Sequence, residues 1–247
     1  MSFDKKFDRK STIGASEGCA VLDIDGHRRS RTVWIEKRSG LVEPNVDTDY
    51  TRAGNLLEPD VVRAYEDAHN LSTFDPEMTK RHREFPMLSA TPDRIDKSGV
   101  RHALIGGLEA KCVFSEKSWA EWQGYDNPFK YEVQCRHSMA VWDLNIWTLI
   151  ACRAKLGENG QPPTIDPTSL QVRTFYRDRI KEDWYVGTLA LWWINHVETG
   201  AVVEEHRRSA GYLGRFQMRF DALTSSEASE TLAAARKAVW GMDNVLL

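Results

Sequence analysis

Residues 89–93, Ser-Ala-Thr-Pro-Asp, and residues 108–111, Leu-Glu-Ala-Lys, are the two stretches around which the rest of the 247-residue chain can be placed. Glu109 and Lys111 are two positions apart, and side chains i and i+2 of a β-strand point to the same face. Asp93 ends the preceding strand-like run, so a hairpin between the two runs would bring a second carboxylate to the same place. Two convergent carboxylates beside a lysine suit a hard divalent cation and an activated water.

The hairpin itself is predicted from two strand-like runs, residues 85–96 and 104–113, joined by the polar residues 97–102. On the second run Leu108 and Ala110 face one side, and the two charged residues face the other. Because a half-buried strand normally turns its charges to solvent, an isolated Glu-x-Lys also fits an ordinary surface pair.

Two expected helices add further polar groups. Residues 50–69 show helical periodicity, and Pro59 predicts that the regular helix begins near Glu58 or kinks there. The helix dipole alone is a sufficient reason for a carboxylate at that point. A second helix, over residues 129–142, places Gln134 at the edge of its apolar stripe.

The N-terminal segment, residues 9–22, is expected to be a loop followed by a short helix with Ser16 or a neighbour near its cap. Free amides at such a position bind anions, although capping alone also explains the serine. A second short helix over residues 32–39 and a loop over 40–50 follow.

The remaining elements are expected in the second half of the chain. A tryptophan-rich connector covers residues 118–122, strands cover 145–153 and 170–176, and a turn-rich loop covers 157–167. A helix over residues 178–198 is expected to end before Gly200. Its inward side chains are expected to be Ile180, Trp184, Leu191 and Ile194.

The C-terminal tail contains Thr-Ser-Ser-Glu at residues 224–227, which fits a capping box that opens a helix through Trp240. The apolar face of this helix is thin. We expect it to pack on its own chain rather than on another subunit. The apolar face of this helix consists of Ala228, Leu232, Ala235 and Val239.

Composition favours one large core, because 41% of the residues are hydrophobic and nine Trp, nine Phe and seven Tyr supply bulk. We expect a cytoplasmic protein, since no stretch is apolar enough for a signal or a membrane span. The four cysteines form no C-x-x-C pair, which argues against a zinc ribbon and the usual iron–sulfur spacings. Three basic clusters in a chain of net charge -3 permit a polyanionic partner: residues 27–31, 80–83 and 206–208.

The order of these motifs, helix with Glu, strand with Asp, strand with Glu-x-Lys, helix with Gln, resembles the PD-(D/E)XK nuclease superfamily. More narrowly, it resembles the lambda-exonuclease-like, YqaJ-type viral recombinase branch. The matching segments are 13–16 (Ile-Gly-Ala-Ser), 54–59 (Gly-Asn-Leu-Leu-Glu-Pro), 89–93, 108–112 and 131–134 (Tyr-Glu-Val-Gln). The resemblance implies an α/β (α+β) fold, one restriction-endonuclease-like domain over residues 1–200 with a central mixed β-sheet flanked by helices. The resemblance ends near residue 198, and the capping box beyond it predicts that residues 201–247 form a helical extension packed on this core or on a neighbouring subunit.

The resemblance also implies a metal site. Asp93, Glu109 and the backbone carbonyl of Ala110 would hold one Mg²⁺, and Glu58 with Asp93 would help hold a second ion. Mn²⁺ is expected to substitute for Mg²⁺.

The other implied roles belong to the substrate. Lys111 would orient and help deprotonate the attacking water, and Gln134 would position that water or the scissile phosphate. Arg9 and Ser16 are seven positions apart, the spacing of the arginine and serine that grip a 5′-terminal phosphate in this branch.

The function implied is that of a Mg²⁺-dependent 5′→3′ exonuclease on linear double-stranded DNA, from a phage or prophage in a bacterial host. It would leave 3′ tails for a single-strand annealing partner, and it would form a homotrimeric ring. The alternatives are a structure- or sequence-specific endonuclease of the same superfamily and a non-catalytic DNA-binding module. The scattered cysteines disfavour an iron–sulfur nuclease of the CRISPR-associated type.

Overall fold

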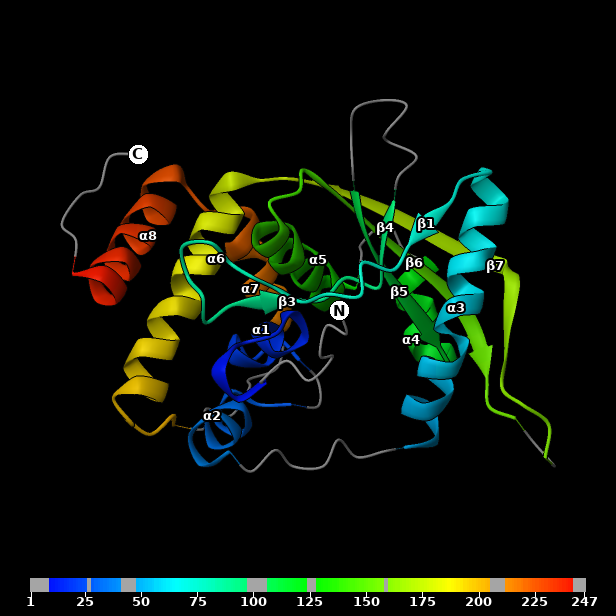
Figure 1. Cartoon of the computed structure of the whole chain (residues 1–247), viewed down its shortest axis with the longest axis horizontal. Coiled ribbons are helices and arrows are strands. Elements are labelled where there is room, and N and C mark those ends of the chain that lie inside the picture. The colour runs from blue at the N-terminus through cyan, green and yellow to red at the C-terminus, as the bar shows by residue number, and fades with distance from the viewer. Residues whose placement is uncertain are drawn as a thin grey trace.

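A mixed five-stranded sheet runs through one half of the molecule (Figure 1), with strand order β1-β4-β5-β6-β7. The computed structural model describes residues 9–25, 28–40, 48–96, 106–123, 128–157, 160–204 and 212–241. The β5–β6 pair is parallel, and the other three pairs are antiparallel. The strands are β1 (Thr73–Phe74), β4 (Arg94–Asp96), β5 (Gly106–Val113), β6 (Ile146–Lys155) and β7 (Thr164–Tyr176). The expected central mixed sheet is therefore confirmed.

Helices cover both faces of this sheet. Helix α3 (Asp49–His69) packs on the face that carries Leu108 and Ala110, through Val61, Val62 and Tyr65. Helices α4 (Glu116–Gln123) and α5 (Phe129–Trp142) cover the opposite face. The period-2 alternation of β5 places Glu109 and Lys111 on one face, as the sequence predicts, and α5 lies over that face.

A two-stranded sheet of β2 (Lys80–Arg81) and β3 (Ser89–Ala90) lies beside the N-terminal segment. Within that segment, the 3-10 turn η1 (Arg9–Ser11) leads to Ile13, which forms a parallel bridge with Leu88. Helices α1 (Ala15–Val21) and α2 (Ser30–Ser39) follow, close to their expected positions.

After β7, the described elements are all helices. Helix α6 (Arg179–Trp192) continues as the π-helix η3 (Trp193–Glu198), and Gly200 takes φ +81° just beyond it. Helix α7 (Tyr212–Asp221), which the sequence analysis missed, is followed by α8 (Ser225–Trp240), whose predicted capping box is confirmed. Helix α8 packs along α6 (Figure 1), and Leu232 and Ala235 join the core formed by α1, α5 and α6.

Helix α3 corrects the prediction drawn from Pro59. The helix begins at Asp49, well before Glu58, and continues through the proline. Thr48 caps it by accepting a hydrogen bond from the Thr51 amide at 3.1 Å. A proline removes a single amide donor, and the buried Ala53 and Leu57 hold the first half of the helix in place.

Three other expectations need correction. The tryptophan-rich connector is the helix α4, because Trp119 and Trp122 are both buried on one side of it. Strand β7 starts at Thr164 rather than residue 170. It includes Pro167, which an edge strand with a register shift tolerates. Ile180 is 37% exposed, whereas the inner face of α6 holds Tyr185, Val186, Leu189 and Ala190, because both α5 and α8 pack on this helix.

Candidate active site

Asp93 lies in the short link between β3 and β4, directly before Arg94 pairs with Leu108 of β5. Its Oδ2 atom accepts a hydrogen bond from the Ala110 amide at 2.8 Å. The predicted hairpin therefore exists between β4 and β5, and it brings Asp93 to β5. Strand β3 is not part of that hairpin, since it pairs with β2 instead.

Glu109 is the centre of the cluster. It is 4% exposed, and its Oε1 atom accepts hydrogen bonds from Lys111 Nζ and, at 2.6 Å, from Gln134 Nε2. The alternative of a solvated Glu-x-Lys pair is thus wrong, because α5 covers the face on which both residues lie. Four of the residues predicted from sequence meet here: Asp93, Glu109, Lys111 and Gln134.

The charges of the cluster perturb one another strongly. Burial and then the Asp93 carboxylate raise the pKa of Glu109 to about 7, although Lys111 acts in the opposite direction. Burial also raises the pKa of Asp93, although Lys111 and the Ala110 amide counteract it. For Lys111, burial would lower the pKa, but Glu109 and Asp93 outweigh it and raise the pKa overall. Lys111 is therefore an ammonium whose charge balances two crowded carboxylates.

Glu58 lies at the edge of the cluster. Burial and then the Asp93 carboxylate raise its pKa, which shows that the two acids are close. Arg94 Nη1 is 3.8 Å from Glu58 Oε1 and 3.8 Å from Asp75 Oδ2. Arg94 was not predicted as a site residue, and the only feature of the sequence that could have indicated it is its position next to Asp93.

The donor set suits a hard divalent cation. Among the described residues, no three His, Cys, Asp or Glu side chains form a metal-binding group. Mg²⁺, however, commonly uses one or two carboxylates and completes its shell with water and substrate phosphate. Asp93, Glu109 and the Ala110 carbonyl could supply such a set, and a cation between the two acids would offset the burial that raises both pKa values.

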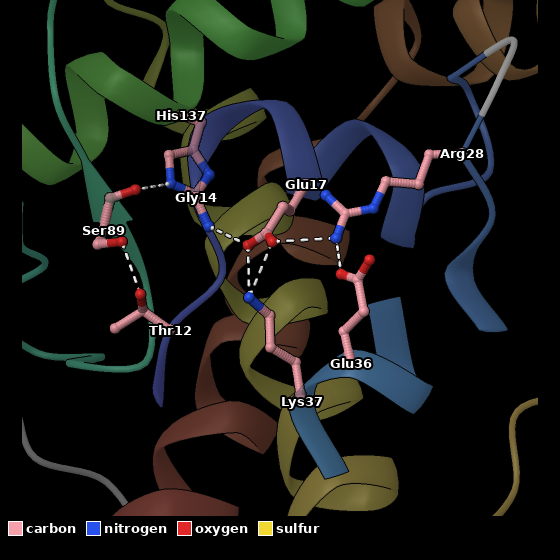
Figure 2. Close-up of polar contacts among 8 residues, drawn as sticks. All are labelled: Thr12, Gly14, Glu17, Arg28, Glu36, Lys37, Ser89 and His137. Atoms are coloured by element: carbon pink, nitrogen blue, oxygen red, sulfur yellow. Dashed lines mark hydrogen bonds and ion pairs between the residues drawn. The ribbon is translucent and has the colours of Figure 1, made fainter. Parts of the chain in front are cut away.

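The expected phosphate-binding pair is placed only in part. Ser16 is exposed in the first turn of α1, and its neighbour Gly14 is the N-cap residue. The Gly14 amide donates to Glu17 Oε2 at 2.9 Å (Figure 2). The Arg9 side chain lies outside what the structure describes, so the Arg9–Ser16 pair stays a prediction.

A buried ion network beneath α1 was not predicted. Lys37 Nζ lies 2.8 and 2.7 Å from the two carboxylate oxygens of Glu17, and its side chain is 2% exposed. Arg28 Nη2 bonds Glu17 Oε1 at 3.2 Å and also pairs with Glu36 (Figure 2). The network joins α1 to α2, and it shows that part of the first basic cluster is structural. No local pattern marks it, because the partners lie up to 20 positions apart.

The other basic residues differ in role. Lys80 Nζ lies 4.1 Å from the centroid of the Trp142 ring, and Arg81 donates to Ser11 Oγ at 2.7 Å. His82 Nδ1 accepts from two backbone amides. His27 and residues 206–208 lie outside the described residues. None of the described helices is long and apolar enough to cross a membrane.

Comparison with known proteins extends these observations. A family model described as the YqaJ-like viral recombinase domain matches residues 6–145, which include the whole cluster. Among curated proteins, none matches the chain.

Two solved structures, both of an alkaline exonuclease (LHK-Exo) from Laribacter hongkongensis, share the fold. The first has a TM-score of 0.53 at 17% identity, over 87% of this chain and 90% of the other. The second, in complex with dAMP, has a TM-score of 0.54 at 15% identity, over 90% and 96%. At these identities the likeness establishes the fold.

Proposed function

The chain belongs to the YqaJ-like viral recombinase family, and from this membership we propose that it is a recombination nuclease, specifically a Mg²⁺-dependent 5′→3′ exonuclease on linear double-stranded DNA. The observation that supports the proposal most is the buried cluster of Asp93, Glu109, Lys111 and Gln134. Buried charges that are grouped at one point and perturb one another are typical of catalytic sites.

In this proposal Asp93, Glu109 and the Ala110 carbonyl hold one Mg²⁺, and Glu58 with Asp93 helps to hold a second. Mn²⁺ replaces Mg²⁺. Bound Mg²⁺ supplies positive charge that stabilises the phosphoryl oxygens and the leaving 3′ oxygen in the transition state. The protein supplies the oxygen ligands and, through the Ala110 amide, fixes the Asp93 carboxylate.

Lys111 and Gln134 act on the attacking water and the phosphate. Lys111 orients the water, and its ammonium charge stabilises the hydroxide that forms when the water loses its proton to solvent. Gln134 donates its amide N–H to Glu109, which leaves the amide oxygen as an acceptor for that water. The products are 5′-phosphorylated mononucleotides, a class that includes the dAMP bound by the exonuclease from Laribacter hongkongensis.

The DNA end and the partners complete the proposal. Arg9 and the exposed Ser16 bind the 5′-terminal phosphate. The 3′ tails pass to a single-strand annealing protein, and a homotrimer encircles the duplex, with basic side chains along its channel. The protein acts in the cytoplasm of a bacterial host.

The test compares three substrates in Mg²⁺: a 5′-phosphorylated linear duplex, its 5′-hydroxyl twin and a closed circular plasmid. We expect the phosphorylated duplex to be degraded fastest and the plasmid to stay intact. An inactive protein would contradict the nuclease proposal, a cut plasmid would favour an endonuclease, and equal rates on the two duplexes would overturn the roles of Arg9 and Ser16.

The site itself is tested with Lys111→Ala and a matched control, Lys117→Ala, which changes an exposed lysine of α4. Lys111→Ala should lower the rate by at least about 100-fold, and Lys117→Ala should leave it unchanged. If Lys111→Ala matched the wild type, the cluster would not be the catalytic site.

A further inference from the structure

Strand β3, which leads into Asp93, pairs with β2 along one edge and only briefly with the N-terminal segment along the other. Ile13 donates its amide to Met87 O at 2.6 Å, and Ser89 donates its amide to Ile13 O at 2.9 Å. The next donor of this parallel ladder would be the amide of residue 15, aimed at Ser89 O. Ala15 opens α1 instead, so the ladder stops one step before the end of β3.

Side chains of α5 donate to the last two carbonyls of β3. His137 Nε2–H donates to Ser89 O at 2.9 Å (Figure 2), and Trp142 Nε1–H donates to Ala90 O at 3.0 Å. The same helix carries Gln134, whose amide bonds Glu109. Helix α5 therefore holds both the strand that leads to Asp93 and the side chain of Glu109.

His137 makes a second hydrogen bond through its other ring nitrogen. Its Nδ1 atom is 3.0 Å from Tyr185 Oη, and both side chains are 1% exposed. Because Nε2 donates to a carbonyl, Nδ1 of the neutral ring accepts, and the Tyr185 hydroxyl donates. A Cβ atom at Gly18 would lie 2.0 Å from Tyr185 Oη, so this glycine leaves room for the hydroxyl beside α1.

We propose that His137 is a positioning residue of the nuclease site, which fixes Asp93 by anchoring the Ser89 carbonyl. The inference rests on the proposed function. Asp93 is held on its downstream side by the β4–β5 pairing, and His137 with Trp142 holds the chain on its upstream side. A displacement of about 1 Å in a catalytic group can cost about 100-fold in rate, so loss of the upstream anchor affects catalysis beyond its effect on stability.

Three variants separate positioning from simple stabilisation. His137→Gln keeps an amide N–H near the position of Nε2 and therefore the bond to Ser89. His137→Asn reaches only the position of Nδ1 and loses that bond. Tyr185→Phe is the matched control, because it removes a buried hydrogen bond of the same side chain and leaves the Ser89 bond intact.

The first readout is the turnover rate at saturating linear duplex in Mg²⁺. We expect His137→Asn to lower the rate by about 100-fold with little change in KM, and His137→Gln and Tyr185→Phe to stay close to wild type. Equal losses in His137→Asn and Tyr185→Phe would overturn the proposal.

The second readout needs no catalysis. The Ala110 amide donates to Asp93 Oδ2, so its hydrogen exchange reports the position of that carboxylate. Exchange at Ala110 should be faster in His137→Asn than in Tyr185→Phe, and equal rates would contradict the positioning role. If exchange changes as expected while the wild-type protein cuts no DNA, the nuclease proposal fails and the anchoring of Asp93 stands.

Trp142→Phe provides a variant of the same anchor if His137→Asn does not fold. It removes the donor to Ala90 O and keeps an aromatic ring. Lower turnover and faster Ala110 exchange support the proposal, and wild-type values of both overturn it.

Discussion

Acidification should destabilise the fold through His137. Burial lowers the pKa of this histidine from 6.5 to about 4, and His82 acts in the same direction, while the bond to Ser89 O opposes the shift. The unfolded chain therefore binds a proton in a pH range where the folded chain does not. The stability contributed by the neutral ring is fully present above pH 6.5 and is lost as the pH falls towards 4.

The magnitude follows from the size of this shift. A difference of 6.5 minus 4 is about 2.5 pKa units, which corresponds to about 3 kcal/mol in full. By pH 5, the linkage relation gives a loss of about 2 kcal/mol relative to pH 7.5. The ring is 1% exposed, so solvent screens little of this energy.

The assay is urea unfolding of wild type and His137→Gln at pH 7.5, 6 and 5. Other groups titrate in this range, and some have the opposite sign. Glu182, whose pKa burial raises to about 7, loses stability as the pH rises. The unfolding free energy of the wild type minus that of His137→Gln reports the contribution of His137. This difference should fall by about 2 kcal/mol between pH 7.5 and 5.

Tyr185→Phe is the control, since it keeps the imidazole and should follow the pH dependence of the wild type. Parallel curves for wild type and His137→Gln would refute the assignment of a buried, neutral histidine.

Three further predictions concern the buried ion network and two glycines. Lys37→Met should lower the unfolding free energy by about 3 kcal/mol, because it leaves the buried Glu17 carboxylate without its main partner. Adding Glu17→Gln should recover part of this loss in the same urea titration. Gly54→Ala should raise the unfolding free energy by about 0.5–1 kcal/mol, since a Cβ there meets nothing within 4 Å and alanine favours the helix. An unchanged or lower stability would contradict that expectation. Gly187→Leu should lower the thermal midpoint, because a Cβ at residue 187 already lies 3.0 Å from the Thr231 backbone of α8. A midpoint equal to wild type would show that α8 can move away freely.

The sequence was sufficient to predict the centre of the candidate site. The two-residue period placed Glu109 and Lys111 on one face of β5, and the hairpin brought Asp93 to them. Resemblance supplied Gln134, which meets Glu109 as expected. Burial of the charges was not predictable from the strand alone, because it depends on α5 packing over that face.

The rest depended on contacts between distant segments. His137 and Ser89 are 48 positions apart, and neither carries a local pattern that indicates the other. Likewise, nothing in residues 85–96 indicates that β3 pairs with β2 in a sheet separate from β4 and β5. The helix start predicted from Pro59 was wrong for the opposite reason. The local rule that a proline belongs in the first turn was outweighed by the cap at Thr48 and by the packing of the first half of α3.

The hydrogen bonds from α5 to β3 also impose an order on the folding of the chain. The Ser89 and Ala90 carbonyls gain these donors only after a helix that begins 39 residues further along has docked. Such non-local contacts form late, because the intervening loop must first close. A chain emerging from the ribosome can therefore pair β4 with β5, but nothing anchors β3 or covers Glu109 until residues 129–142 have been made. The nuclease should become competent to cut DNA as one of the last events of its own folding.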